Sequence, residues 1–206
     1  VRSTGYEEMA LSSLSSGDYS AIDELAAELG RELAKEGVSL SLPSLRLDSF
    51  SEEMTRDLQR VRKSGLTFAP EAGTQRLRDV INKNIREEDL LQAVGKAFAA
   101  GWTRVKLYFM IGLPTETDED LAAIARLVRR VVAVYREAGN RGRPQATVSA
   151  SVFVPKAHTP FQWVGQISRQ EMLRRQELLR RALRIPGVQF QWHDADASIL
   201  EAALAR

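Results

Sequence analysis

Short runs of strand-forming residues alternate with helical segments along the chain, and this alternation restricts the fold more than any other feature. Successive runs begin about 30 to 40 residues apart, which leaves room for a helix in each connection. Connections of this kind join parallel strands through right-handed crossovers, so the pattern predicts an α/β fold with a parallel sheet. We expect strands over residues 9–14, 38–42, 66–69, 105–111, 147–154 and 188–192.

Two of the expected strands alternate apolar residues with serines. Ser39 and Ser41 lie in one of them, and Ser149 and Ser151 lie in another. Strands of a parallel sheet that is covered on both faces usually form continuous apolar runs. The alternation therefore favours a curved sheet, as in a barrel or partial barrel, with one face on helices and the other on a polar cavity. A partly exposed sheet edge is the alternative interpretation.

Helix boundaries are marked as well. Ser168 followed by Glu171 predicts a capping box at the start of a helix. Gly101 and Gly139 stand where helical periodicity stops, and we expect helices to end there.

Composition excludes several classes of protein. A net charge of +2 gives no support for nucleic-acid binding, and no apolar run approaches the roughly 20 residues that span a bilayer. The chain has no cysteine, so neither a disulfide framework nor a thiolate metal site is possible. His158 and His193 lack acidic or thiol companions at metal-binding spacing, and we expect no metal ligands here. A single domain in the cytoplasm fits these features.

The turn Ser15-Ser16-Gly17-Asp18 follows the first expected strand. Free backbone N–H groups and hydroxyls at such a turn can bind a small polar ligand. An ordinary strand–helix loop, capped by Asp18 or Ser20, is the alternative.

Further candidates follow the third and fourth expected strands. In parallel α/β folds ligands bind beyond the carboxyl ends of the strands, which is where Glu71 lies. Its alternative role is an ion pair with Arg76 or Lys83. Gly112 ends the most apolar strand and permits close approach by a flat ligand. Residues 153–163, rich in proline and aromatic residues, could form a lid or a substrate-facing wall, or simply a rigid surface crossing.

Taken in order, four segments of the chain resemble the radical S-adenosylmethionine (SAM) superfamily. They are SLSSGDYS, TFAPEAGTQRLRDVINKNI, LYFMIGLPTET and FVPKAHTPFQW. The likeness covers nearly the whole chain and is greatest to the branch that carries a cobalamin-binding domain before the radical SAM core. It implies a parallel (β/α) partial barrel.

The resemblance also implies roles for particular residues. The turn at residues 15–19 would hold the methionine amino end of SAM, and Glu71 would lie beside the ribose or methionine portion. Lys83 matches a basic position that pairs with the SAM carboxylate. Ile111 and Gly112 would pack against adenine. None of these residues is expected to be a catalytic group or a metal ligand.

The absence of cysteine is a departure from the family. Its chemistry requires a Cys-x3-Cys-x2-Cys loop that holds a [4Fe–4S] cluster, on which SAM is cleaved to a 5′-deoxyadenosyl radical. We therefore expect residues 1–206 to be the C-terminal larger part of a radical SAM core, without its first strand and cysteine loop, and catalytically silent alone. The parent enzyme would use SAM and the cluster, and cobalamin bound by another domain is a further candidate cofactor.

Two expectations about partners accompany this interpretation. The first strand, residues 9–14, would be an exposed sheet edge able to pair with a second copy of the chain. The alternative to the enzyme is a non-catalytic parallel α/β module that binds phosphate or another anionic partner through the turns at residues 13–20 and 71–76.

Overall fold

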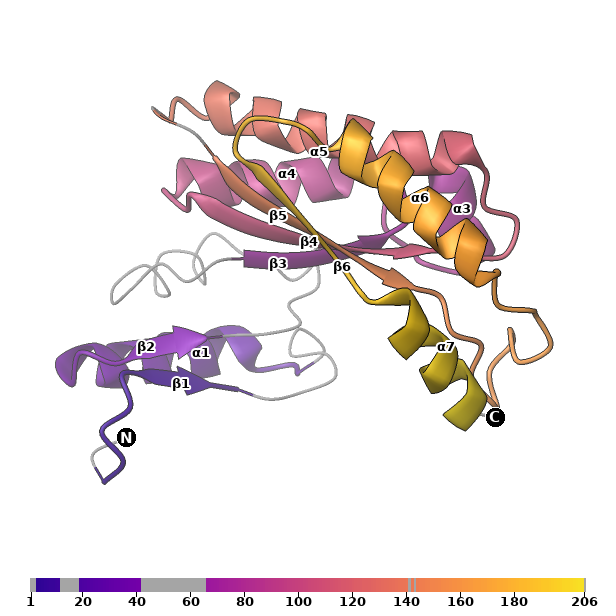
Figure 1. Cartoon of the computed structure of the whole chain (residues 1–206). Helices are drawn as coiled ribbons and strands as arrows, with labels where there is room; N and C mark the ends of the chain where they lie inside the picture. The colour runs from indigo at the N-terminus through magenta and orange to yellow at the C-terminus, as the bar shows by residue number, and fades with distance from the viewer. Residues whose placement is uncertain (1–2, 12–18, 42–65, 141, 143, 206) are drawn as a thin grey trace.

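The computed structural model describes residues 3–11, 19–41, 66–140, 142 and 144–205, in which one or two helices separate consecutive strands of the larger sheet (Figure 1). The strands are β1 (Glu8–Ala10), β2 (Ser39–Ser41), β3 (Leu66–Glu71), β4 (Arg104–Ile111), β5 (Gln145–Val152) and β6 (Val188–Trp192). The helices are α1 (Ile22–Lys35), α3 (Gln75–Val80), α4 (Glu87–Ala99), α5 (Asp118–Glu137), α6 (Arg169–Ala182) and α7 (Ala195–Leu204).

Every strand pairing in the described part of the chain is parallel, which confirms the predicted fold class. Strands β3, β4, β5 and β6 form a four-stranded sheet in that order, so consecutive strands are neighbours. Strands β1 and β2 pair with each other in a separate two-stranded sheet, with α1 between them in sequence. Each of the six predicted strands overlaps an observed one. The prediction that residues 9–14 form an edge for self-association stays a prediction.

Helices α4, α5 and α6 all lie on one side of the four-stranded sheet (Figure 1). Their apolar stripes pack against alternate residues of the strands, and Leu107, Val148 and Val131 have no exposed surface. Burying a side chain of this size stabilises a fold by about 1.5–3 kcal/mol. This helix-covered face is therefore the main core of the protein.

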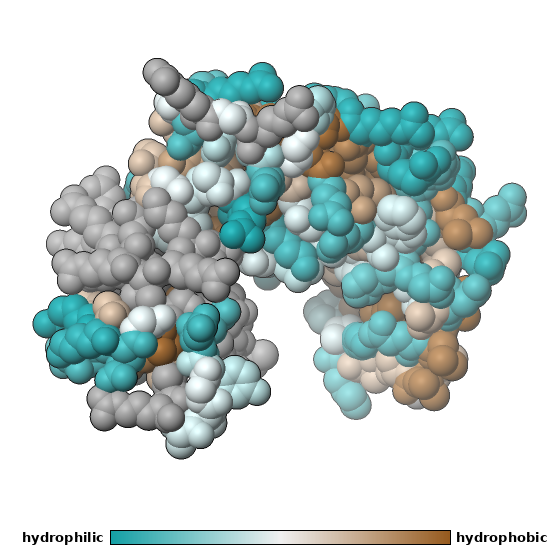
Figure 2. All heavy atoms as spheres, turned by 60° about the vertical axis from the view of Figure 1, so that its left-hand side comes forward, coloured by the Kyte–Doolittle hydropathy of each residue, from teal (hydrophilic) through white to brown (hydrophobic). Residues whose placement is uncertain are grey.

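The opposite face of the sheet carries polar side chains. Along β4 the buried positions alternate with positions such as Tyr108, which is 38% exposed. On β5 the same face carries Ser151, which is partly exposed, and Ser149, which is 6% exposed. The serine alternation thus predicts correctly that one face packs on helices and the other is polar. Figure 2 shows the molecule hollowed on this side of the sheet.

Local signals at the helix ends match the structure with one exception. Gly101 and Gly139 follow α4 and α5 with positive φ angles of 87° and 76°, a conformation that favours glycine. Ser168 caps α6 and its hydroxyl accepts a hydrogen bond from the Glu171 N–H at 3.3 Å. The reciprocal half of the predicted capping box is wrong, because the Glu171 carboxylate instead binds Arg174 and Arg175.

Within the described ranges, no helix is both long enough and apolar enough to cross a membrane.

Candidate functional site

Strand β3 ends in a distorted segment that presents a carboxylate. The register with β4 shifts between Phe68 and Glu71, and Glu71 has a φ of 66°, which is unusual for a residue with a side chain. The Ala72 N–H closes a tight turn onto the Pro70 carbonyl at 2.8 Å. Strained backbone of this kind concentrates at functional sites, where the surrounding structure holds it. Glu71 is thus a candidate site residue on structural grounds alone.

Lys83 reaches this carboxylate from the far end of the same connection. Its Nζ lies 3.2 Å from Glu71 Oε1, and the two side chains keep 33% and 23% of their surface exposed. The backbone N–H of Lys83 donates to the Arg78 carbonyl at 2.8 Å, which fixes the residue just after α3. An acid and a base therefore lie side by side at the carboxyl end of the sheet, accessible to a ligand.

A buried carboxylate at the start of α5 ties the β3 loop to the β4 loop. Asp120 has 2% of its side chain exposed and accepts hydrogen bonds from Thr74 Oγ1, Arg76 and, at 2.8 Å, the Thr117 N–H. Burial raises the pKa of Asp120, but these hydrogen bonds outweigh burial and lower it below its usual value. Arg76 therefore pairs with Asp120. The ion pair expected as the alternative role of Glu71 is present, and its partner is Lys83.

Gly73, in the loop after β3, allows that loop to approach the start of α5 closely. A Cβ on Gly73 would collide with the backbone of α5 at Asp120 and Ile124. Close approach of two backbones therefore requires glycine at this position.

A second buried carboxylate holds the end of β4. Glu116 Oε2 accepts the Gly112 N–H at 2.7 Å and also pairs with Arg175 from α6. Their side chains are 1% and 12% exposed. Burial raises the pKa of Glu116 to about 7, against the opposing effects of the Gly112 N–H and the Arg175 guanidinium. The loop after β4 is thus anchored to α6.

The structure gives a different reason for glycine at position 112 than close approach of a ligand. Gly112 has a φ of 81°, and a Cβ there would lie 2.8 Å from Ile167 Cδ1. The Ile111 side chain is fully buried on the helix-covered face. Any contact with adenine would therefore use the backbone at these positions, and that contact stays a prediction.

Apolar residues from three consecutive loops pack together beside the Glu71–Lys83 pair. Ala72, Leu113 and Phe153 are each at most 8% exposed, and Phe161 meets Phe153 edge-on with 5.9 Å between ring centroids. The segment 153–163 thus packs against the loops that follow β3 and β4. Trp163, 89% exposed, projects from it. Its role as a lid or wall stays a prediction.

The structure brings the four predicted site residues that it describes to one end of the sheet. Glu71, Ile111 and Gly112 lie at the carboxyl ends of the adjacent strands β3 and β4, and Lys83 contacts Glu71. Ser15, Ser16, Gly17 and Asp18 lie outside the described residues.

Sequence reasoning missed the buried carboxylates of this end. The signal for Asp120 was available, because Thr117-x-x-Asp120 is a capping-box spacing and the structure has that box. No local pattern marks the Glu116–Arg175 pair, whose members are far apart in sequence.

A parallel sheet whose loops converge at the carboxyl ends of its strands is an architecture of ligand-binding α/β proteins. The sequence matches the radical SAM superfamily over residues 2–128, more than half of the chain. The chain belongs to that superfamily. It is also 33% identical over 208 residues to the uncharacterized protein MJ0966 of Methanocaldococcus jannaschii, and the match covers the whole chain but 43% of that protein's length.

Proposed function

We propose that the carboxyl end of β3 and β4 binds SAM in an enzyme that generates the 5′-deoxyadenosyl radical. The observation that carries the proposal is the partly exposed Glu71–Lys83 pair, 3.2 Å apart at the end of a distorted strand. SAM carries an ammonium group and a carboxylate on its methionine moiety. Lys83 would pair with that carboxylate, and Glu71 would accept hydrogen bonds from the ammonium group or the ribose hydroxyls.

The residues of this chain fit SAM but not the iron–sulfur cluster. A [4Fe–4S] cluster is held by cysteine thiolates, and none of the 206 residues is cysteine. We propose that the cluster ligands lie elsewhere in the parent protein and that this chain alone is catalytically silent. The length of the matched relative, of which the chain covers 43%, is compatible with a larger parent.

Anaerobic reconstitution with iron and sulfide tests whether this chain can bind the cluster by itself. The purified chain should contain no stoichiometric iron and should lack the charge-transfer absorbance of a cluster. Iron and sulfide at cluster stoichiometry would overturn the proposal.

Ligand binding tests the SAM site itself. Saturation-transfer NMR detects weak complexes, and we expect the chain to bind SAM and S-adenosylhomocysteine. Glu71→Ala and Lys83→Ala should each weaken binding about tenfold or more, since each removes a charge-assisted contact. Glu88→Ala, which removes an exposed carboxylate on α4, is the matched control and should bind as the unchanged chain does.

The same experiment separates the rival function. A non-catalytic module would show no saturation transfer to the adenosine protons, or would lose it when inorganic phosphate competes at the turn of residues 71–76. Selective binding of the nucleoside supports the enzyme.

The finer assignment, to the branch with a cobalamin-binding domain, rests on the four segments and the order in which they occur. Titration of the whole parent protein with hydroxocobalamin, followed by visible absorbance, tests it. If the spectrum does not change at stoichiometric cobalamin, the assignment to this branch is overturned, whereas the proposed SAM site is unaffected.

A further inference from the structure

The open face of the four-stranded sheet carries two rows of polar side chains. Strand register places Lys106, Thr147 and Gln189 side by side on β4, β5 and β6. Two residues further along the strands, Tyr108, Ser149 and Gln191 form a second row. Neighbouring strands lie about 4.8 Å apart, so each row spans roughly 10 Å. We call these six residues the polar rows.

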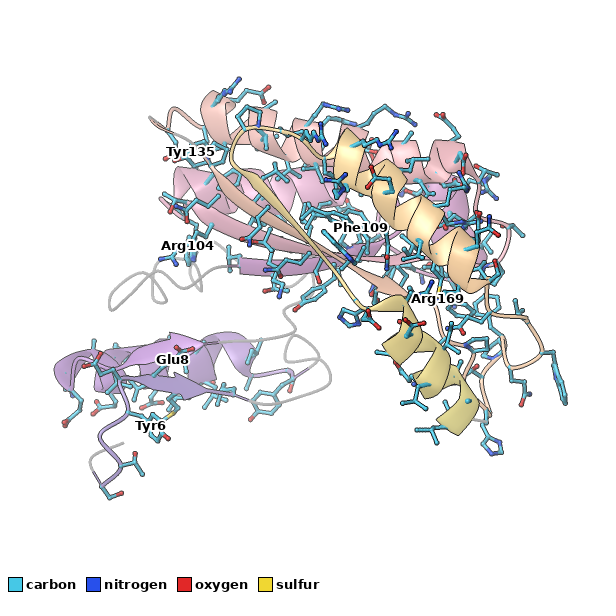
Figure 3. The ribbon with its side chains drawn as sticks, viewed as in Figure 1. Tyr6, Glu8, Arg104, Phe109, Tyr135 and Arg169 are labelled. Atoms are coloured by element: carbon cyan, nitrogen blue, oxygen red, sulfur yellow. The ribbon has the colours of Figure 1, made fainter. Side chains whose placement is uncertain are left out.

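The polar rows face away from the helices. Residues between them along the strands, such as Leu107 and Val148, are fully buried on the helix-covered face. Alternation then directs the polar rows to the opposite side. In Figure 3 Phe109 lies toward the helices. Arg104 lies at the amino end of β4, two residues before Lys106, and therefore belongs to the same face of the strand as Lys106.

Lys106 is the one charged residue of the polar rows. Lys106 has its Nζ 4.7 Å from the Tyr108 ring centroid, and within the described ranges it forms neither an ion pair nor a hydrogen bond. The polar rows contain no carboxylate. Arginines of α6, by contrast, are paired with acids, as Arg174 is with Asp118 and Glu171. A lysine on a concave polar surface without an acidic partner favours an anionic ligand.

The hydrogen-bonding groups around Lys106 suit the same ligand. The hydroxyls of Thr147 and Tyr108 and the amides of the two glutamines can all donate to the oxygens of an anion, whereas Ser149 is 6% exposed. The Tyr108 ring holds the lysine ammonium in place through a cation–π contact. The polar rows thus combine one charge with several neutral donors.

The distance to the candidate SAM site limits the size of the ligand. Glu71 is in register with Phe109, three residues beyond Lys106, which corresponds to roughly 10 Å along the strand. A molecule with its anion at Lys106 would have to be roughly 10 Å long to reach the level of Glu71.

We propose that the polar rows bind the anionic group of the enzyme's substrate, a small organic molecule with a carboxylate or phosphate roughly 10 Å from the carbon that reacts. The statement that the bound molecule is a substrate rests on the proposed function. The existence of the anion site does not. Lys106 supplies the charge, and the hydroxyls and amides orient the anion. The molecule lies along the open face toward the carboxyl end of the sheet.

Two-dimensional amide NMR of the purified chain tests the site with defined probes. Titration with succinate and, separately, with inorganic phosphate should shift the amide signals of residues 106–108, 147–149 and 189–191. The neutral analogue succinamide should produce no such shifts. A response to one anion alone would identify the chemical class, carboxylate or phosphate.

Two variants define the role of the lysine. Lys106→Ala should weaken binding of the active anion about tenfold or more, and Lys106→Arg should retain most of it because the charge is kept. Lys96→Ala removes an exposed lysine from α4, on the helix-covered side, and should bind as the unchanged chain does.

The outcomes separate this inference from the proposed function. Shifts confined to other residues, or binding that Lys106→Ala leaves unchanged, overturn the anion site. S-adenosylhomocysteine added to the same samples reports the SAM site independently through residues 71–83 and 111–113. Anion shifts at the polar rows without nucleoside binding would support the anion site and count against its use for a substrate of a radical SAM enzyme.

Discussion

The two faces of the four-stranded sheet are composed of alternate residues of the same strands, yet they have opposite chemistry. On the helix-covered face Leu107, Val148 and Phe109 are at most 1% exposed. On the open face Lys106 and Tyr108 retain accessible surface and have few partners. Stability therefore depends mainly on one face, which leaves the other free to vary with the ligand it binds.

The carboxyl end of the sheet combines the two kinds of chemistry. Buried Asp120 and Glu116 brace the loops after β3 and β4, whereas the Glu71–Lys83 pair stays accessible. Rigid support thus lies directly behind groups that can bind a ligand. A site whose supporting contacts are already formed needs little rearrangement to bind.

The largest difference between the faces should follow from adjacent substitutions on β4. Leu107→Ala should lower the free energy of unfolding by about 2–5 kcal/mol, because it opens a cavity in the main core. Lys106→Ala, the next residue on the opposite face, should change it by about 0.5 kcal/mol or less. Urea denaturation followed by circular dichroism measures both. Equal losses would mean that the open face also carries the fold.

The buried carboxylate of Glu116 predicts a pH dependence. Its pKa is about 7 in the folded protein against an ordinary 4.5, so its contribution to stability is fully present below pH 4.5 and is lost as the pH rises through 7. The loss amounts to at most about 3 kcal/mol. Glu116→Gln should remove it, so the stability difference between the two proteins should change between pH 4.5 and 7.5.

Glu177 provides the control for that measurement. Arg180 and Arg181 lower the pKa of this surface carboxyl to about 2, so Glu177→Gln should leave the pH profile between 4.5 and 7.5 unchanged. Parallel profiles for the unchanged chain and Glu116→Gln over this range would refute the role assigned to Glu116.

A smaller loss of stability is expected when Asp120, which joins the loops after β3 and β4, is replaced. Asp120→Ala should lower the free energy of unfolding by about 2 kcal/mol, since Thr74 and Thr117 lose their acceptor. Asp79→Ala removes an exposed carboxylate that accepts from Gln75, and it should have little effect. Thermal unfolding of the two variants compares them directly. A negligible shift for Asp120→Ala would show that the loops are held by apolar contacts alone.

The smallest effect should occur at the start of α6, which covers the apolar face. Ser168→Ala should cost about 1 kcal/mol, because the Glu171 N–H loses its capping acceptor. Ser168→Asp keeps an acceptor and should restore the stability. Urea denaturation detects both changes, and an identical loss in the two variants would exclude capping as the cause.

Local patterns predicted the parts of the fold that depend on neighbours in sequence. The predicted strand at residues 188–192 has the observed bounds, and alternation assigned Ser149 and Ser151 to the open face. Gly101 and Gly139 ended helices because left-handed backbone at a helix end favours glycine whatever surrounds it. These features need no knowledge of the tertiary structure.

Contacts between distant residues could not be predicted in the same way. Arg175 looks like one of many arginines on a charged helix, and only the packing of α6 on the β4 loop buries it against Glu116. The separation of β1 and β2 from the larger sheet has no signal in their short sequences either. For Glu71 the sequence offered two partners, Arg76 and Lys83. The structure selects Lys83 and shows the left-handed backbone at Glu71.

The sheet order β3-β4-β5-β6 repeats the order of synthesis. Each new strand can therefore pair with one that the ribosome has already released, and no strand has to be inserted between two others. The apolar face of β4 can be covered by α4 and α5 before β6 exists. Vectorial assembly of this kind limits the time during which a bare hydrophobic sheet is exposed to other nascent chains.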